Sequence, residues 1–388
     1  MPPISLNRRR FLGCSAASLA LSHGPLTAQA AATGGPLKPV RVGLIGVGNR
    51  GTTLLRTLLD LPETTVPIVC DPEPRHRARG QGIVEKAAGQ RPEAVEDPRR
   101  LIERTDLDAV VVAVPCDLHE SITADAIRAG KHLYAEKPLA LTPAGCDRLI
   151  LESRKAPELA VHVGFQRRSN PRFREGVGRV LDGELGPLIE ARASWTSSNG
   201  PLVGHAGWLG RRERSGDFMV EQAVHVWDVL NWLRGGPPVR ASGWGRRGLF
   251  ARADPQRDVT DHYAVELTWA DGFRASFSQS YVAPADDNFT GSHLRVMGVD
   301  GGLDFGTGAL TFRDRSKGRR MIHPGPQNDT RLSLEAFLAA VRAEVPPAPP
   351  VTLAEARDAT LTGLLVRKAV DEAREVAMEE ILSASATV

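Results

Sequence analysis

One glycine-rich turn near the start of the chain constrains the fold more than any other feature. The apolar run Val42-Gly43-Leu44-Ile45 leads directly into Gly46-Val47-Gly48-Asn49-Arg50-Gly51, a G-x-G-x-x-G sequence. Glycines placed after a buried strand let the backbone turn sharply and approach a pyrophosphate at the N-terminus of the next helix. In a chain with 38 glycines this pattern can also arise by chance. Whether it indicates nucleotide binding therefore depends on the residues around it.

The following residues supply that context, because short β-branched runs alternate with helical patterns up to residue 163. We predict strands at 40–45, 66–70, 109–114, 132–135 and 159–163, and helices near 50–60, 74–88, 118–129 and 142–154. This alternation is typical of a doubly wound parallel sheet. We therefore expect an N-terminal Rossmann domain that binds NAD(P) over residues 38–163.

After residue 164 the alternation of strand and helix patterns gives way to strand patterns separated by turn signals. Alternating runs at 265–269 and 274–280 flank Asp271-Gly272, and runs at 294–297 and 303–305 flank a second turn, which is the pattern of antiparallel hairpins. A proline-rich spacer at 346–350 precedes a predicted final helix from 353 to 376. We therefore expect an α/β protein whose second domain, residues 164–388, is α+β with a large, mainly antiparallel sheet and C-terminal helices.

A carboxylate marks the end of the second predicted strand. Asp71 follows Gly51 by 20 residues, where an acidic side chain accepts hydrogen bonds from the adenosine ribose of NAD and repels the 2′-phosphate of NADP. Arg75 and Arg77 lie close enough to keep NADP as an alternative. The predicted cofactor-binding residues of this region are Gly46, Gly48, Asn49, Arg50, Gly51 and Asp71.

The first thirty residues have the pattern of an export signal. Asn7-Arg8-Arg9-Arg10-Phe11-Leu12 precedes a short apolar run and the small-residue site Ala28-Gln29-Ala30. This order is typical of a twin-arginine signal peptide, whose export machinery carries folded proteins. We expect a signal peptide over residues 1–30, a periplasmic or otherwise exported protein, and no membrane anchor. A basic tail without a targeting role and a lipoprotein site at Cys14 are the alternatives.

Charge and cysteine content exclude two classes of function. The formal charge of +3 comes from the three arginines of the signal segment, since the rest of the chain has equal numbers of basic and acidic residues. Such a chain lacks the basic patch that nucleic acid binding needs. Cys70, Cys116 and Cys146 have neither paired nor metal-ligand spacing. We expect no structural disulfide and no metal site.

Further motifs follow in a fixed order. They are Pro115-Cys116-Asp117-Leu118-His119, the run AGKHLYAEKPLA at 129–140, GFQRRSNP at 164–171 and GELG at 183–186. The first two resemble the P-x-x-x-H and A-G-K-H-x-x-x-E-K-P motifs of the Gfo/Idh/MocA family, the relatives of glucose–fructose oxidoreductase and inositol dehydrogenase. The others resemble that family's next two landmarks, so the resemblance covers essentially the whole chain after the signal.

The resemblance implies roles for residues at these motifs. It implies that Lys137 lies beside the nicotinamide and the reacting carbon, often with a cis peptide before the proline, where an ammonium polarises a developing alkoxide. Without this context Lys137 would be an exposed lysine in a turn. The family also has an arginine near the substrate hydroxyls, and we favour Arg168 over Arg167 for it. Further cofactor contacts are expected from Pro115, His119 and Glu136.

A second group of titratable residues lies at 221–228. Helical spacing puts Glu221, His225 and Asp228 on one face, opposite an apolar stripe. A histidine held by carboxylates accepts a hydroxyl proton near neutral pH as hydride leaves the adjoining carbon. His225 corresponds to the family's base, whereas Glu221 replaces its usual aspartate. We predict His225 as the base, Glu221 as its orienting residue and Asp228 as a substrate contact; a solvated polar helix face is the alternative.

Two further features are candidates for substrate contact. Tryptophan is more often a core residue, but its ring also stacks on sugar faces, and the candidates are Trp195, Trp208, Trp227 and Trp232. A glycine-rich loop with His205, Arg211 and Arg212 is placed to cover the site.

Together these motifs predict an exported NAD(P)-dependent oxidoreductase that acts on a carbohydrate or polyol hydroxyl and keeps its cofactor tightly bound. One alternative is a glycosidase that oxidises a sugar transiently with bound NAD, eliminates the aglycone and returns the hydride. Another is a non-catalytic, nucleotide-stabilised binding protein. The resemblance also implies a homo-oligomer formed through the open face of the second sheet. The expected partners are a small carbohydrate and the twin-arginine export machinery.

Overall fold

The computed structural model describes residues 38–323 and 328–383. The predicted signal peptide at 1–30 therefore lies outside the described residues. Within those residues, none of the helices combines the length and the apolarity that are needed to cross a bilayer.

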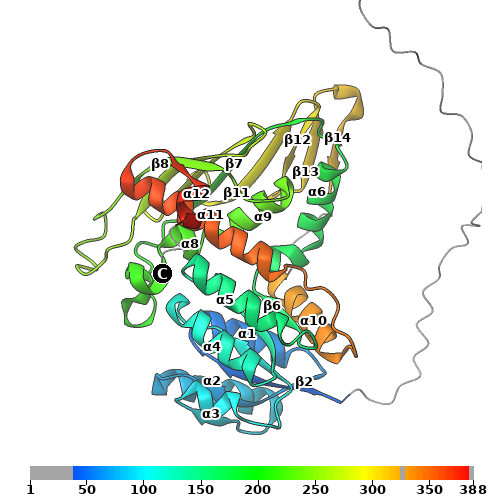
Figure 1. Cartoon of the computed structure of the whole chain (residues 1–388), viewed down its shortest axis with the longest axis vertical. Coiled ribbons are helices and arrows are strands. Elements are labelled where there is room, and N and C mark those ends of the chain that lie inside the picture. Colours follow the sequence, from blue (N-terminus) through cyan, green and yellow to red (C-terminus); the bar gives the residue numbers. More distant parts are fainter. Residues whose placement is uncertain (1–37, 324–327, 384–388) are drawn as a thin grey trace, which may run out of the picture. The chain divides into compact units, whose positions relative to one another are not determined.

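The first half of the chain forms a six-stranded sheet in the order β3-β2-β1-β4-β5-β6, in which every pairing is parallel. Its strands are β1 (Val40–Ile45), β2 (Thr64–Cys70), β3 (Glu93–Val95), β4 (Ala109–Val112), β5 (His132–Ala135) and β6 (Val161–Val163). The connecting helices are α1 (Asn49–Leu59), α2 (Pro74–Ala88), α3 (Pro98–Ile102), α4 (His119–Arg128) and α5 (Pro143–Arg154). The predicted doubly wound fold is confirmed (Figure 1).

Local sequence signals explain why the boundaries of α2 follow the prediction. The Glu73 side chain accepts a hydrogen bond from the backbone N–H of Arg75, and Pro74 occupies the first turn, where its missing N–H costs nothing. Gly89 ends the helix at φ 70°, a left-handed conformation that glycine adopts without strain.

The second half forms a nine-stranded sheet in the order β14-β13-β12-β11-β7-β10-β9-β8-β15. Its strands are β7 (Leu188–Thr196), β8 (Arg240–Arg246), β9 (His262–Thr268), β10 (Arg274–Ser280), β11 (Gly291–Gly298), β12 (Gly301–Asp304), β13 (Ala309–Phe312), β14 (Arg319–Met321) and β15 (Val376–Ala377). All pairings are antiparallel except that of β10 with β7. The prediction of a mainly antiparallel sheet is confirmed.

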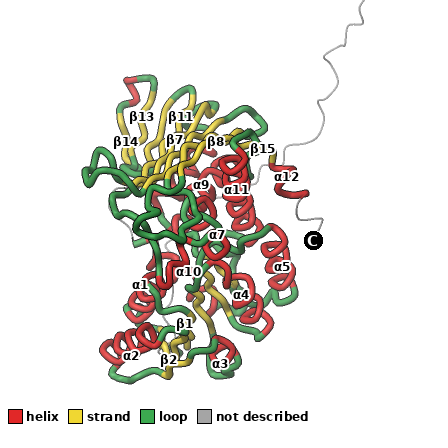
Figure 2. The backbone as a smooth tube through the Cα atoms, turned by 90° about the vertical axis from the view of Figure 1, so that its left-hand side faces the viewer, coloured by secondary structure: helices red, strands yellow, loops and turns green. Residues whose placement is uncertain are grey.

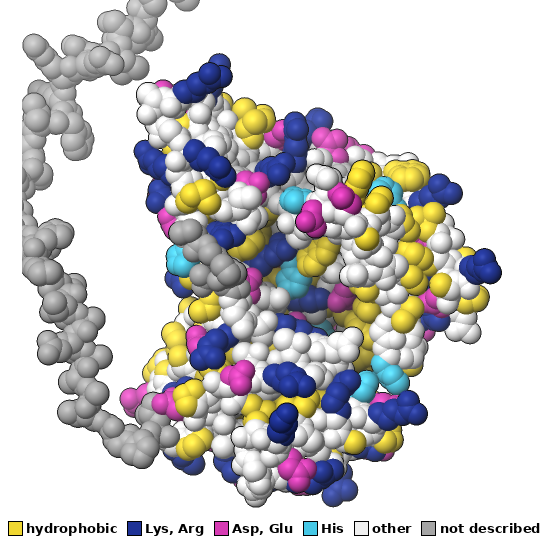
Figure 3. All heavy atoms as spheres, turned by 180° about the vertical axis from the view of Figure 1, so that it is seen from behind, with side chains coloured by type: hydrophobic (Ala, Val, Ile, Leu, Met, Phe, Trp, Pro, Cys, Tyr) yellow, Lys and Arg dark blue, Asp and Glu magenta, His cyan; other side chains and the backbone are white. Residues whose placement is uncertain are grey.

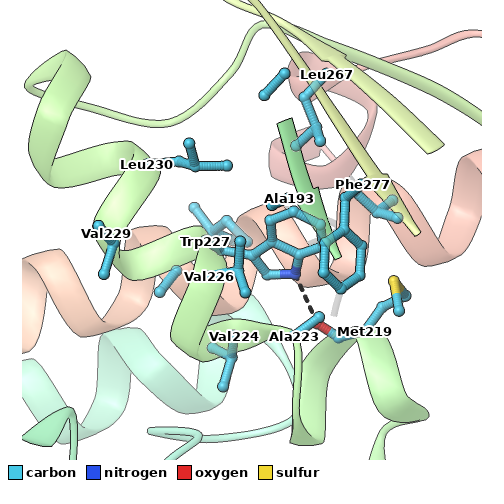
Figure 4. Packing of buried hydrophobic residues seen from close by; sticks show 14 of the residues in the cluster. Ala193, Met219, Ala223, Val224, Val226, Trp227, Val229, Leu230, Leu267 and Phe277 are labelled. Atoms are coloured by element: carbon cyan, nitrogen blue, oxygen red, sulfur yellow. Dashed lines mark hydrogen bonds between the residues drawn. The ribbon is translucent and has the colours of Figure 1, made fainter. Parts of the chain in front are cut away.

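Helices cover one face of this sheet. They include α6 (Pro171–Leu181), α8 (Phe218–Glu221), α9 (Val224–Arg234), α11 (Leu353–Glu372) and α12 (Met378–Ser383). Trp227 of α9 is fully buried against Phe277 of β10, with ring centroids 4.9 Å apart, and its indole N–H donates to the Met219 carbonyl at 2.8 Å (Figure 4). Trp227 is thus a core residue and has no surface for a sugar.

One helix from the end of the chain returns to the first half. In α10 (Asp329–Arg342), the side chains Leu334, Phe337 and Leu338 are buried in the same apolar cluster as β1 and α1. The Phe337 ring lies 5.7 Å from that of Tyr134 in β5, and the Tyr134 hydroxyl contacts Ser333 at 3.2 Å. The predicted division into 38–163 and 164–388 does not separate the packing units, because α10 completes the core of the nucleotide half.

Candidate active site

The glycine-rich turn has room for a pyrophosphate. Gly46 has φ 89°, and a Cβ on it would collide with the Ala113 carbonyl, while a Cβ on Gly51 would collide with the Gly46 carbonyl. Gly48, by contrast, faces open space and precedes α1 without a side-chain cap. The first N–H groups of α1 are therefore available to an anion approaching over Gly48. This cradle fits the phosphates of a dinucleotide.

Asp71 is fixed beside that turn. Its Oδ2 accepts a 2.7 Å hydrogen bond from the Val47 N–H, and its Oδ1 accepts one from the Glu73 N–H at 2.9 Å and lies 3.2 Å from Nδ1 of His76. The carboxylate thus links the end of β2 to the glycine-rich turn. Each carboxylate oxygen has more than one lone pair, so Asp71 keeps capacity for the ribose hydroxyls assigned to it from the sequence.

The other predicted cofactor residues occupy the same edge of the sheet but differ in exposure. Asn49 is exposed at the start of α1, whereas Arg50 extends to Glu136 at the end of β5, donating to its Oε1 from Nε at 2.8 Å. Arg50 also donates to Thr330 of α10 at 2.9 Å. Pro115 starts the turn η1 (Cys116–Leu118) after β4. Arg50 therefore connects the glycine-rich turn, β5 and α10.

His119 has a different role from the cofactor contact that we predicted. Its side chain is buried, and both ring nitrogens lie against main-chain carbonyls, that of Pro138 at 2.6 Å and that of Val114 at 2.9 Å. Such a ring has no nitrogen left for a ligand. His119 instead holds the turn after β4 to the turn that carries Lys137, and the Lys137–Pro138 peptide bond in that turn is cis, as the family pattern implies.

Lys137 and Glu221 form an ion pair between the two halves of the chain. Nζ of Lys137 donates to Oε1 of Glu221 at 2.7 Å and also to the Glu221 carbonyl. Burial alone would lower the pKa of Lys137, but the Glu221 carboxylate and other neighbours outweigh it, and the pKa is raised. Lys137 is therefore an ammonium at neutral pH.

Glu221 does not orient His225, contrary to our prediction. The expected single helix is broken, because α8 ends at Glu221 and α9 begins at Val224, so i, i+4 spacing no longer aligns the two side chains. Gln222 lies at the break, where its carbonyl accepts a hydrogen bond from the His225 N–H at 3.2 Å and its side chain bonds to Gln279 and Tyr281. Within the described part of the chain, Nδ1 of buried His225 has no hydrogen-bond partner.

The surroundings of His225 keep its ring neutral. Burial, followed by the charges of Lys137, Arg167 and Arg50, places the pKa of His225 well below its ordinary value. The ring stacks near Trp195, with centroids 6.2 Å apart and planes at 30°. His225 thus offers an unpaired ring nitrogen beside a cluster of cations.

The two arginines after β6 have different surroundings, and our preference for Arg168 as the substrate contact does not fit its burial. Arg168 is only 5% exposed; it donates to both carboxylate oxygens of Asp228 at 2.8–3.0 Å, bonds to Glu355 and lies over Trp232. Neither Arg168 nor Asp228, itself 1% exposed, is free for substrate. The pair joins the turn η2 (Gln166–Ser169) to α9.

Arg167 is the arginine that lies beside His225. It donates weakly to the His225 carbonyl at 3.4 Å, lies 5.5 Å over the Trp195 ring, and burial lowers its pKa to about 10. Among the described residues no carboxylate is within ion-pair distance of it. Nothing in the sequence distinguishes Arg167 from Arg168. Which of two adjacent side chains faces the site depends on the path of the backbone, and the sequence does not show that path.

The described surface is hollowed between the two halves, and lysine, arginine and histidine side chains gather in the hollow (Figure 3). The site therefore combines an anion cradle, an ammonium held by a carboxylate and a neutral imidazole. This set can bind a dinucleotide and handle the proton of a hydroxyl group.

Two family models match this chain. One, described as an oxidoreductase family with an NAD-binding Rossmann fold, covers residues 40–165, and the second, a GFO/IDH/MocA C-terminal domain, covers 177–304. The chain is 25% identical to myo-inositol 2-dehydrogenase of Thermotoga maritima over 88% of its own length and all of that enzyme. It is 33% identical to inositol 2-dehydrogenase 2 of Saccharopolyspora erythraea over 56% of its length and 60% of the relative.

A solved structure has the same fold. The scyllo-inositol dehydrogenase of Lactobacillus casei, crystallised with NAD(H) and scyllo-inositol, superposes with a TM-score of 0.69 at 19% identity, covering 88% of this chain and all of the other. The TM-score shows that the two chains share the fold.

Proposed function

The chain belongs to the Gfo/Idh/MocA family of NAD-binding oxidoreductases, and we propose that it oxidises one hydroxyl of a cyclic polyol or sugar. The observation that carries this proposal is the juxtaposition of an ammonium, Lys137, with a neutral imidazole, His225, at the edge of the sheet that has the glycine-rich cradle. The names of the inositol dehydrogenases among its relatives support a polyol substrate.

When bound, the nicotinamide ring would accept the hydride from the carbinol carbon. The residues Gly46, Gly48, Gly51 and Asp71 would hold its phosphates and ribose. The chain itself handles the remaining proton. The Lys137 ammonium donates a hydrogen bond to the substrate oxygen, and neutral His225 accepts the hydroxyl proton as the carbon–oxygen double bond forms. Glu221 keeps Lys137 charged, and Arg167 positions the substrate from beside His225.

The test mixes a panel of inositols and aldose sugars one at a time with purified, NAD-loaded protein and follows reduction of the bound NAD by absorbance, so that oxidation is detected whether or not the cofactor leaves its site. Oxidation of at least one polyol or sugar is expected. Absence of NADH formation across the panel, together with release of aglycone from glycosides without net redox change, would support the glycosidase alternative.

We also propose that the enzyme is exported by the twin-arginine route with NAD already bound. The motif around Arg8 and Arg9 supports export, and because the twin-arginine route carries folded proteins, a nucleotide bound in the glycine-rich cradle would travel with the chain. Outside the cytoplasm a resident cofactor must be reoxidised in place. A second carbohydrate would therefore accept the hydride from the bound NADH. We further propose that the protein is a homo-oligomer.

A further inference from the structure

A segment of the second half crosses to the nucleotide half. This crossing segment, residues 203–216, comprises the turn η3 (His205–Gly210) and the short helix α7 (Arg212–Ser215). Figure 2 shows α7 and the loops beside it between the two sheets. Left-handed backbone at Gly204, Ala206, Gly207 and Gly216 folds the segment tightly.

The crossing segment is firmly anchored in the second half. Arg211 donates to both carboxylate oxygens of Asp254 at 3.0 Å, and the Arg212 N–H donates to Asp258 at 2.7 Å. The Gly216 carbonyl accepts a hydrogen bond from Arg367 of α11 at 3.0 Å. These hydrogen bonds therefore fix the crossing segment to the rest of the second half.

Its far side contacts the nucleotide half at two separate places. Nε2 of His205 lies 3.3 Å from Oε2 of Glu73, just after β2, and Nε of Arg214 lies 3.3 Å from Oδ2 of Asp117, just after β4. These four side chains are between 27% and 56% exposed, so each contact can open without breaking a core.

The first contact continues to the glycine-rich turn. The His205 ring packs edge-on against that of His76, with centroids 4.9 Å apart. His76 contacts Asp71, whose other oxygen binds the Val47 N–H. A line of contacts thus runs from the tip of the crossing segment to the turn that cradles the phosphates.

The two contact points lie on either side of the coenzyme position. In the sheet, β1 stands between β2 and β4, and a dinucleotide binds outside the carboxyl ends of these strands, where the strand order reverses. A segment that touches the residues after β2 and also those after β4 must pass over the glycine-rich turn at the end of β1.

We propose that the crossing segment is the outer wall of the coenzyme site and retains NAD, with the His205–Glu73 and Arg214–Asp117 contacts as its two points of closure. This inference rests on the proposed function, in which one NAD serves many turnovers. Coenzyme leaves only after both contacts separate, so they slow its release and add little to the chemistry.

The test measures coenzyme release without turnover. Full-length protein is loaded with NADH, mixed with excess NAD, and the loss of bound NADH fluorescence is followed. Partly exposed pairs contribute up to about 1 kcal/mol, so H205Q and R214Q should each speed release about threefold and the double variant about tenfold. R240Q, which breaks an exposed pair with Glu375 far from this edge, is the matched control and should release NADH as the parent does.

Two further measurements separate closure from misfolding. Raising ionic strength should speed release from the parent protein more than from the double variant, since salt screens exposed ion pairs. H205Q combined with E73Q should be no faster than either alone, because both remove the same contact. Unchanged release in H205Q/R214Q would overturn the inference while leaving polyol oxidation intact; failure of polyol oxidation with faster release would overturn only the proposed function.

Discussion

Nζ of Lys137, at the end of the nucleotide half, donates a 2.7 Å hydrogen bond to the carboxylate of Glu221, which the second half supplies. The ion pair is formed only when both halves are folded together, so the carboxylate that offsets the burial of the Lys137 ammonium is supplied by the other half of the chain.

Replacing Lys137 with alanine should lower kcat about 100-fold, the scale of a lost acid–base group, while NADH binding measured by fluorescence titration stays near the parent value. E221Q should lower kcat less, about tenfold, because the amide oxygen still accepts the hydrogen bond but no longer favours the ammonium. Equal activity of K137A and parent would remove Lys137 from the proton transfer.

The base should work in mildly acidic solution. The base must be neutral to accept a proton, and burial with three nearby cations lowers the pKa of His225, so kcat/KM should stay level from pH 8 to below pH 6.5 and fall only as the ring is protonated. R167Q removes one of those cations, so the pKa of His225 should rise and the acidic limb should move to higher pH. A limb that does not move would show that another group controls it. H225N should lower kcat about 100-fold at all pH values.

Substitutions at Asp228, the partner of Arg168, and at Arg167 should have different effects: the first should lower stability and the second should lower substrate affinity. D228A leaves the Arg168 guanidinium buried without its bidentate partner, which costs about 3–5 kcal/mol, visible in urea unfolding. R167Q should instead raise KM with little change in unfolding. R128Q, which breaks a surface pair with Glu152, is the control and should cost less than about 1 kcal/mol. A stable D228A protein with raised KM would restore Asp228 as a substrate contact.

Asp71 should determine the preference for NAD. D71S removes the charge that repels a 2′-phosphate, so the NADP to NAD affinity ratio should rise about tenfold, a change of about 1.4 kcal/mol. D71N, which keeps an acceptor for the Val47 N–H, separates charge from the hydrogen bond. If neither variant changes the ratio in titrations of cofactor-free protein, another residue reads the ribose.

Export should depend on Arg8 and Arg9. Changing both to lysine should leave full-length precursor in the cytoplasm, as fractionation and immunoblotting would show, because the twin-arginine machinery reads the pair directly. Changing Lys38, outside the signal, is the control. Normal periplasmic accumulation of the double variant would contradict the export proposal.

The sequence predicted the parallel sheet well because its strands are short apolar runs with clear turn and cap signals, as at Glu73 and Gly89. It did not reveal β7 and β8, whose inward and outward residues alternate imperfectly, with several positions half-buried on each strand. It also did not reveal β3, a strand of only three residues at the sheet edge.

Residue types and motif spacing indicated candidate site residues, but they did not indicate which side chains contact one another. Motif spacing indicated Lys137, Glu221 and His225. Because the helix breaks at Gln222, the Glu221 carboxylate contacts Lys137 and not His225. The choice between Arg167 and Arg168 and the dual carbonyl contacts of His119 depend on tertiary packing, which spacing along the chain does not encode.

The return of α10 into the core of the first sheet sets the order in which a newly made chain can mature. The last strand of that sheet ends at Val163, but the part of its apolar surface that α10 covers stays exposed until Leu334, Phe337 and Leu338 have been synthesised. At translation rates of about 5–20 residues per second, the nascent nucleotide half waits for many seconds. A polypeptide truncated anywhere before α10 would therefore leave this part of the first core exposed to water.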